Sequence, residues 1–147
     1  MPLTSKVFSY DTQLEWEGGR RCRVISGTRP PVVVAPPEDF PGGDHELWSP
    51  EHLYLASLQS CTMLSFLAHC AHNGVEVVDY RSEASGELGR RDDDLRYAFR
   101  RVGMIVTVHV AGGHVPLAQS LTDKARRDCF ISASTTAEID TAWRISE

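Results

Sequence analysis

The sequence lacks long apolar runs and has no excess of positive charge. Its longest purely apolar runs, such as Val32–Ala35, are far too short to cross a bilayer. The segment MPLTSKVFSYDTQLEWEGG contains no apolar stretch of the kind that forms the core of a signal peptide. The 147 residues carry a formal net charge of −5, which disfavours a nucleic-acid partner. We therefore expect a cytoplasmic protein that binds neither membranes nor nucleic acids.

Cysteine is scarce, and its four positions are Cys22, Cys61, Cys70 and Cys129. Because the sequence shows no export signal, we expect these thiols to be reduced, catalytic or inert rather than a disulfide framework. Cys61 and Cys70 are nine residues apart, so a helix would place them on opposite sides and roughly 13 Å apart along its axis. A disulfide between these two is therefore excluded. Packing alone would explain each cysteine, since cysteine is often buried, and a catalytic role for Cys61 stays open at this point.

The order of strand-like and helix-like patterns predicts one α+β domain over residues 1–147. Strand patterns occur in runs rather than in strict alternation with helices, which favours α+β over α/β. With 41% hydrophobic and 24% charged residues, the composition is that of a globular domain. The expected parts are a β-rich region over about 1–48, a central helix over about 49–73, a β-hairpin over about 75–111, a second helix over about 115–129 and a last strand over about 137–146. The β-rich region begins with an imperfectly alternating strand pattern over Lys6–Trp16.

The central helix has clear sequence signals at both ends. Ser49 is a good N-cap, Pro50 suits the first helical position, and Glu51 favours the positive end of the helix dipole. Asn73-Gly74 is a typical helix stop. Its leucines are spread around the helix at Leu53, Leu58, Leu64 and Leu67. A helix that is apolar on several sides is expected to be central rather than superficial.

Two separated segments resemble the OsmC/Ohr family of thiol-dependent organic hydroperoxide reductases. In GGDHELWSPEHLYLASLQSCT, the run Pro50–Leu53 matches the family's helix start, and Cys61 follows Glu51 by ten residues. In KARRDCFISAS, Cys129 opens the family's C-x-x-S segment. The resemblance implies an OsmC-like fold, in which antiparallel sheets wrap around central helices in an intertwined homodimer.

The resemblance also implies a reaction and roles for particular residues. Cys61 would be the peroxidatic cysteine that reduces an organic hydroperoxide to an alcohol, and Cys129 would resolve the resulting sulfenic acid as a disulfide. The family uses no bound cofactor, and an external dithiol such as dihydrolipoamide would reopen the disulfide. An arginine held by a glutamate would stabilise the Cys61 thiolate. Alignment of GGRRCRVIS with the family points to Arg20 as the arginine and to Glu51 as the glutamate.

Two neighbours of Arg20 compete for its role, and Glu51 raises a geometric problem. Arg21 and Arg23 would face the opposite side of a strand from Arg20. A helix rises 1.5 Å per residue, so Glu51 would lie about 15 Å from Cys61 along a continuous helix. We therefore expect Glu51 to serve the active site of another chain, which again predicts a homodimer with composite sites. Glu51 also has a simple alternative role as a helix-dipole residue.

Some features leave the function open. The residue after Cys129 is Phe130, where the best-known peroxidases of the family often have proline, and this points to the OsmC-like branch. The alternative hypothesis is a non-enzymatic protein that binds an apolar small molecule at the dimer interface, with redox-sensitive cysteines. His69 and His72 flank Cys70, but no other spacing supplies further metal ligands, so we expect no metal.

Overall fold

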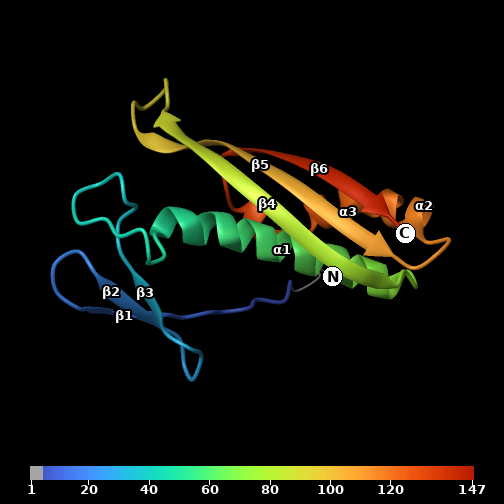
Figure 1. The fold of residues 1–147 in the computed structure, drawn as a ribbon, viewed down its shortest axis with the longest axis horizontal. Helices are drawn as coiled ribbons and strands as arrows, with labels where there is room; N and C mark the ends of the chain where they lie inside the picture. Colours follow the sequence, from blue (N-terminus) through green and yellow to red (C-terminus); the bar gives the residue numbers. More distant parts are fainter. Residues whose placement is uncertain (1–4) are drawn as a thin grey trace. The chain divides into compact units, whose positions relative to one another are not determined.

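The structure is a computed structural model that describes residues 5–147 (Figure 1). The chain divides into two compact units, one ending at Leu53 and the other covering Tyr54–Glu147. The central helix α1, Pro50–His72, begins in the first unit and continues through the second. In the described residues, no helix combines the length and apolarity that a membrane crossing requires.

The first unit contains a three-stranded antiparallel sheet in the order β1-β2-β3. The strands are β1 Gln13–Trp16, β2 Cys22–Ile25 and β3 Val32–Val34. Gly18 and Gly19 make the turn between β1 and β2 with φ angles of 90° and 55°, a region that glycine adopts without strain. The strand expected over Lys6–Trp16 is much shorter than predicted, because only its last four residues pair with β2.

The second unit contains the sheet β4-β5-β6. Its strands are β4 Val77–Arg90, β5 Tyr97–Val110 and β6 Glu138–Ser146. β4 and β5 form the expected antiparallel hairpin, whereas β6 pairs with β5 in parallel. The structure thus differs from the purely antiparallel sheets that we expected, because the chain crosses back through helices between β5 and β6 before it re-enters the sheet.

Helix α1 has almost the bounds that its capping residues predict. The backbone N–H of His52 donates to Ser49 Oγ at 3.1 Å, so Ser49 is the N-cap. After the helix, Gly74 has a φ of 73°, and the N–H of Val75 donates to the Cys70 carbonyl at 2.9 Å. Its buried side chains recur every four residues and face the sheet: Leu58, Thr62, Phe66 and Cys70. They pack against the inward-facing valines of β5 and the short helices after it.

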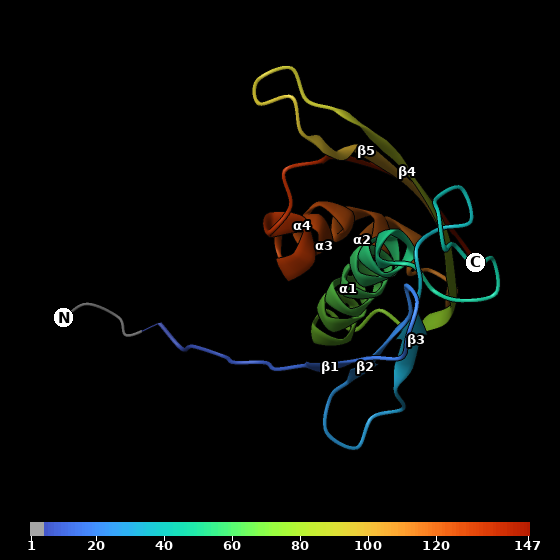
Figure 2. The same ribbon diagram turned by 90° about the vertical axis from the view of Figure 1, so that its left-hand side faces the viewer.

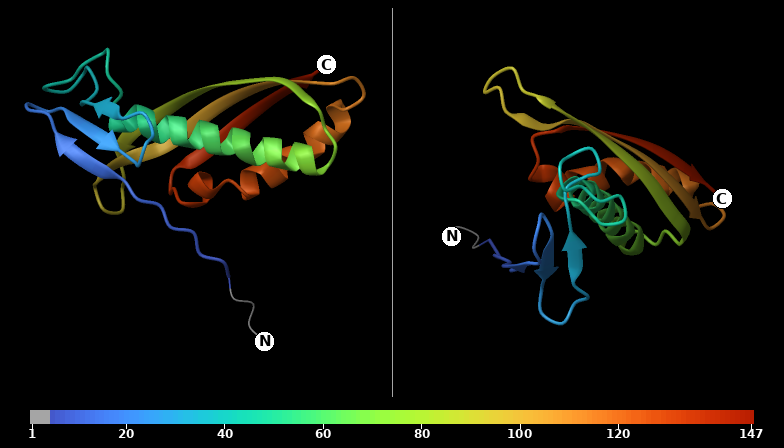
Figure 3. Two further views of the ribbon diagram at one scale, coloured as in Figure 1. Left: turned by 90° about the horizontal axis from the view of Figure 1, so that it is seen from below. Right: turned by 60° about the vertical axis from the view of Figure 1, so that its left-hand side comes forward.

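The second helix, expected as one element over 115–129, is broken. The chain forms α2 Val115–Ser120, α3 Thr122–Arg127 and α4 Phe130–Ala133. At the first break the N–H of Leu121 donates to the Ala118 carbonyl at 3.1 Å, a tighter turn than the α-helical one. Leu121 is only 2% exposed, so the break lets its side chain enter the core. Figures 2 and 3 show all these helices and α1 on the same face of the β4-β5-β6 sheet.

Candidate active site

Cys61 lies on α1 and is partly buried. With other residues of α1 it lines a groove of about 690 Å³. The remaining lining residues, from α1 and the α3–α4 region, are Ser57, Ser60, Leu64, Ser65, Ala68, His69, Asp128, Phe130 and Ile131. Leu64 is 61% exposed and Phe130 is 77% exposed. The groove therefore offers a partly exposed thiol between apolar walls.

Cys129 lies between α3 and α4 and acts as the N-cap of α4. Its Sγ accepts a hydrogen bond from the backbone N–H of Ser132 at 3.4 Å. On the other side, Thr62 Oγ1 of α1 lies 3.8 Å from the same sulfur. Cys129 is only 1% exposed, so its thiol is held in place rather than free in solvent.

The two cysteines predicted to react with each other are brought together in the second unit. Burial raises the pKa of the Cys61 thiol, and the neighbouring Cys129 side chain raises it further. The nearby backbone N–H groups of Ile131 and Phe130 act in the opposite direction and lower it. The net direction is upward, so in this arrangement Cys61 is held as a thiol near neutral pH. Attack on a peroxide requires an additional group that stabilises the thiolate.

A histidine and an aspartate line the same groove as Cys61. His69 Nε2 lies 2.8 Å from Asp128 Oδ2, and Arg127 contacts the same carboxylate at 3.0 Å and 3.1 Å. Hydrogen bonds from Arg127 and His69 hold the pKa of the Asp128 carboxyl below its usual range, so Asp128 is ionised near neutral pH. This cluster is next to Cys129 in sequence.

The first unit holds a separate pocket of about 380 Å³ that contains two predicted site residues. Arg20 and Glu51 both line it, together with Cys22 and Phe40. The carboxylate atom Oε2 of Glu51 is buried and has no hydrogen-bond partner within residues 5–147. An orphaned buried carboxylate oxygen calls for a partner that the single chain does not supply.

The three competing arginines have different surroundings in the first unit. Arg21 pairs with Asp44 at 2.7 Å, and Arg23 pairs with Glu17 at 2.6 Å. Arg20 donates to the carbonyl of Pro41 at 3.1 Å, and within the described chain it has no carboxylate partner. Arg20 is therefore the arginine whose charge is not already neutralised by an ion pair, and it shares its pocket with Glu51.

Helix α1 is continuous between Glu51 and Cys61. It runs from Pro50 to His72 without a break, so ten residues of α-helix separate the two side chains. At 1.5 Å per residue this is about 15 Å along the axis. The helix does not bring Glu51 beside the Cys61 of its own chain.

The other two cysteines have different environments. Cys22 starts β2 and lines the pocket of Arg20. Cys70 is 1% exposed in the core of the second unit, and burial raises the pKa of its thiol. Its surroundings are those of a packing residue. Throughout residues 5–147 no group of three or more His, Cys, Asp or Glu side chains could hold a metal ion.

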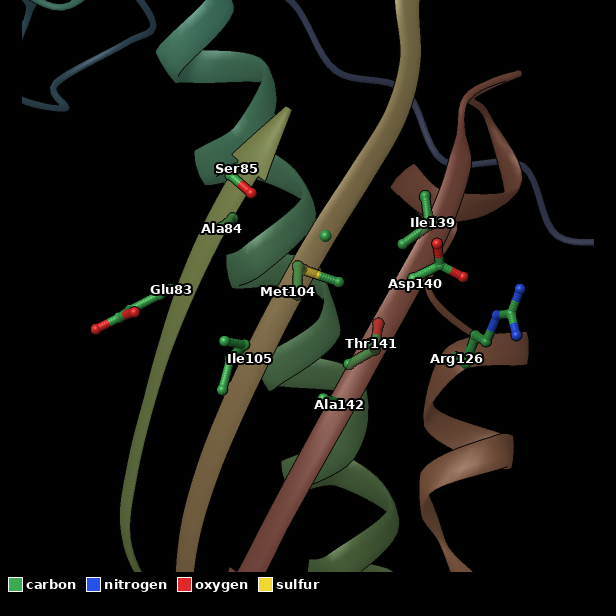
Figure 4. A pocket seen from close by; sticks show the side chains of 11 residues that line it. Glu83, Ala84, Ser85, Met104, Ile105, Arg126, Ile139, Asp140, Thr141 and Ala142 are labelled. Carbon is green, nitrogen blue, oxygen red and sulfur yellow. The ribbon is translucent and has the colours of Figure 1, made fainter. Parts of the chain in front are cut away.

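Another hollow, of about 610 Å³, spans β4, β5 and β6 and is shown in Figure 4. Glu83, Ile105, Asp140 and Arg126 are among its lining residues. No cysteine is among the described residues that line it, so it offers no thiol to a peroxide.

Sequence reasoning missed the contacts around Cys129. It treated His69 only as a weak metal ligand, and it did not consider Thr62 or Asp128. A partial signal existed, because His69 follows Cys61 by eight residues and so lies on nearly the same helix face. The partner of His69 is Asp128, the residue before Cys129. This contact depends on the break between α3 and α4, which the sequence did not reveal.

The sequence was compared with models of known protein families. The sequence model of one family, described as OsmC-like protein, matches residues 43–144. The matched range contains Glu51, Cys61 and Cys129 but not Arg20. No match was found among curated proteins.

Solved structures show the same fold. An OsmC-like protein of unknown function from Vibrio cholerae has a TM-score of 0.84 at 19% identity, covering 93% of this chain and 99% of that one. An organic hydroperoxide resistance protein from Elizabethkingia anophelis has a TM-score of 0.74 at 19% identity, covering 98% and 99%. One from Legionella pneumophila has a TM-score of 0.66 at 21% identity, covering 94% and 98%. At these identities the likeness establishes the fold.

Proposed function

Because the chain belongs to the OsmC-like family, we propose that it is a thiol-dependent peroxidase that reduces organic hydroperoxides to alcohols. One observation carries the proposal: Cys61 lines a groove with apolar walls, and the buried Cys129 lies near it behind the groove. Such a groove suits the organic part of an alkyl hydroperoxide better than it suits hydrogen peroxide. Structural relatives named as organic hydroperoxide resistance proteins also support the proposal.

In the first step Cys61 is the nucleophile. Its thiolate attacks the outer oxygen of the hydroperoxide, the O–O bond breaks, and the alkoxide leaves as the alcohol after it takes up a proton. Sulfur is oxidised to the sulfenic acid while the peroxide is reduced. The partial exposure of Cys61 and its place in the groove give the peroxide access to it.

In the second step Cys129 is the resolving thiol. Its sulfur attacks the Cys61 sulfur, the S–O bond breaks, and one water leaves as the disulfide forms. An external dithiol, such as dihydrolipoamide, then exchanges with this disulfide and restores both thiols. No bound cofactor takes part in these steps. The activity would serve in defence against oxidative stress, and we place it in the cytoplasm, where the thiols would be kept reduced.

Activation of Cys61 is assigned to Arg20, with Glu51 as the residue that orients it. Burial raises the pKa of Cys61, so a nearby cation is needed to favour the thiolate near neutral pH. Arg21 and Arg23 are already paired with carboxylates, whereas Arg20 shares a pocket with the unpartnered Glu51 oxygen. These contacts support Arg20 over its two neighbours.

Steady-state turnover tests the proposed function. Reduction of cumene hydroperoxide is followed with dihydrolipoamide as the reductant. Turnover that is abolished in Cys61→Ser supports a peroxidase. If the wild-type protein consumes no hydroperoxide and both thiols resist alkylation at neutral pH, the proposal fails.

The partner of this chain is proposed to be a second copy. The length of α1 between Glu51 and Cys61 requires Glu51 to act on another chain if it acts at a Cys61 site. Apolar side chains exposed on the single chain supply surface for such a contact: Leu14 and Trp16 of β1 are 64% and 75% exposed, and Leu64 is 61% exposed. The solution mass checks this, and a fully active monomer would refute composite sites.

A second candidate function rests on the raised pKa of Cys61. If no cation lowers it, the protein would bind an apolar small molecule at the dimer interface without turning it over, and its thiols would respond slowly to oxidants. Binding of an apolar fluorescent probe without any peroxide consumption would favour this function. Rapid turnover excludes it as the main activity.

A further inference from the structure

The junction between α3 and α4 is attached to α1 by two adjacent residues. Cys129 contacts Thr62, with 3.8 Å between sulfur and hydroxyl oxygen. The preceding residue, Asp128, contacts His69, with 2.8 Å between carboxylate oxygen and ring nitrogen. Thr62 and His69 are seven residues apart, which is two turns of α1, so both project from similar directions. Figure 2 shows α3 and α4 lying beside α1.

We propose that His69, acting through Asp128, positions the Cys129 thiol for its attack on the oxidised Cys61. This inference rests on the proposed peroxidase function and adds a residue to it. His69 contacts neither reacting sulfur in the described structure, so it is a positioning residue and not a catalytic one.

The chemistry explains why position matters at this step. The Cys129 sulfur displaces the hydroxyl of the Cys61 sulfenic acid, and the S–S bond forms as water leaves. A disulfide tolerates only a narrow range of separations and dihedral angles between the two residues. Cys129 stands between two short helices, so a small shift of Asp128 would move its sulfur. Misplacement of reacting groups by about 1 Å can cost roughly 100-fold in rate.

A contribution to stability alone does not explain the contact between His69 and Asp128 well. The His69 and Asp128 side chains are 21% and 41% exposed, and ion pairs with that exposure contribute little to stability. Helix α3 is already attached to α1 elsewhere, because Ser65 Oγ donates to the Ala125 carbonyl at 2.8 Å. The His69–Asp128 contact differs from that attachment in acting on the residue next to Cys129.

Three variants and a single-turnover assay test the proposal. His69→Ala removes the contact, and His69→Gln keeps an N–H donor for Asp128. Gln59→Ala is the matched control, since Gln59 links the same helix to Ser82 of β4 at 3.1 Å and 3.0 Å and does not approach the α3–α4 junction. Each protein receives one equivalent of cumene hydroperoxide. Peroxide consumption reports the first step, and trapping of sulfenic acid with a dimedone reagent, followed by disulfide mapping, reports the second.

In His69→Ala we expect Cys61–Cys129 disulfide formation to slow by about tenfold when its rate is measured from the Cys61 sulfenic acid onward. His69 also lines the groove, so any change in peroxide consumption is measured separately and does not enter this rate. Sulfenic acid then accumulates, and a second equivalent of hydroperoxide, added afterwards, converts it to sulfinic acid. His69→Gln should restore most of the disulfide rate, and Gln59→Ala should match wild type. Should His69→Ala fail to fold, Asp128→Asn serves in its place, with the same direction of change expected.

Three outcomes would overturn the proposal. A disulfide rate in His69→Ala equal to wild type would show that His69 does not position Cys129. An equal slowing in Gln59→Ala would show that general loosening of α1 is responsible. If the wild-type Cys61 is not oxidised at all, the peroxidase function fails and this inference fails with it, a result that the peroxide consumption distinguishes from the other two.

Discussion

The groove around Cys61 and the pocket around Arg20 contain complementary groups. The groove belongs to the unit Tyr54–Glu147 and holds the Cys61 thiol between apolar walls, with the pKa of Cys61 raised by burial. The pocket belongs to the unit that ends at Leu53 and holds a guanidinium group and a carboxylate oxygen that has no hydrogen-bond partner within residues 5–147. Thiolate chemistry needs a nucleophile and a cation that stabilises it. This chain therefore carries these two requirements on separate units.

Removing the nucleophile from the groove gives the largest expected effect. Cys61→Ser should lower hydroperoxide turnover by at least about 1000-fold, because a hydroxyl is far less acidic and less nucleophilic than a thiol. Cys22→Ser is the control, since it also exchanges a thiol for a hydroxyl of similar size but at a cysteine that takes part in no proposed bond change, and it should lower turnover far less than Cys61→Ser does. If turnover were lost in Cys22→Ser but kept in Cys61→Ser, the nucleophile would lie in the Arg20 pocket and not in the groove.

Removing the cation from the pocket should have the next largest effect. In Arg20→Ala the pKa of Cys61 should rise further, so that alkylation of Cys61 at neutral pH slows by about 100-fold. The rate is measured against pH with iodoacetamide in each variant. Arg21→Ala and Arg23→Ala are matched controls with ion pairs to Asp44 and Glu17, and they should change the rate little. An unchanged Cys61 pKa in Arg20→Ala contradicts its role.

A backbone change in the pocket should have a smaller effect. A Cβ at Gly43 would lie 2.0 Å from the carbonyl oxygen of Pro37, which lines the Arg20 pocket, so Gly43→Ala must displace that loop. We expect a loss of about 1–3 kcal/mol in unfolding free energy and about tenfold lower turnover. Gly112→Ala is the control, because nothing lies within 4 Å of its Cβ position. Thermal unfolding and turnover are measured on the same protein samples. A fully active Gly43→Ala would show that the Arg20 pocket does not contribute to the reaction.

The smallest effect is expected when the buried hydroxyl group of Tyr80 is removed. Like Glu51 Oε2, the Tyr80 hydroxyl is buried without a partner among residues 5–147, but it lies in the second unit and has no assigned role. Burial, and to a lesser degree the nearby Cys129, raise the pKa of Tyr80 well above its usual value. Tyr80→Phe should leave unfolding free energy unchanged or raise it by up to about 1 kcal/mol.

Tyr54→Phe is the matched control for that change. The Tyr54 hydroxyl is hydrogen-bonded to Thr135, so its removal should destabilise the protein by about 1 kcal/mol. Both values come from chemical denaturation of the two variants and the wild type. A larger destabilisation in Tyr80→Phe than in Tyr54→Phe would show that the Tyr80 hydroxyl has a partner after all.

Local signals in the sequence predicted much of the fold. The expected helix over 49–73 is observed as Pro50–His72, because Ser49 at one end and Asn73-Gly74 at the other act through their immediate neighbours. The alternating strands over 75–111 form the expected hairpin for a similar reason. Other features depend on contacts far apart in sequence. The break at Leu121, the parallel pairing of β6 and the truncation of the first strand are decided by what each segment packs or pairs with.

The candidate site divides in the same way. Motif resemblance selected Cys61 and Cys129, and the structure places them together because α1 and the α3–α4 junction pack against each other. The choice among Arg20, Arg21 and Arg23 could not be made from alternation, since it depends on the carboxylates of Asp44 and Glu17. The contact between His69 and Asp128 could not be predicted either, because it joins residues 59 positions apart.

Peptide mapping after one equivalent of cumene hydroperoxide shows whether Cys61 and Cys129 react as a pair. The protein is treated at neutral pH, free thiols are blocked, and disulfide-linked peptides are identified by mass spectrometry. If Cys129 resolves the oxidised Cys61, we expect one new disulfide between Cys61 and Cys129 within a chain, with Cys22 and Cys70 still free. Cys61 that remains a free thiol while the peroxide persists would contradict it.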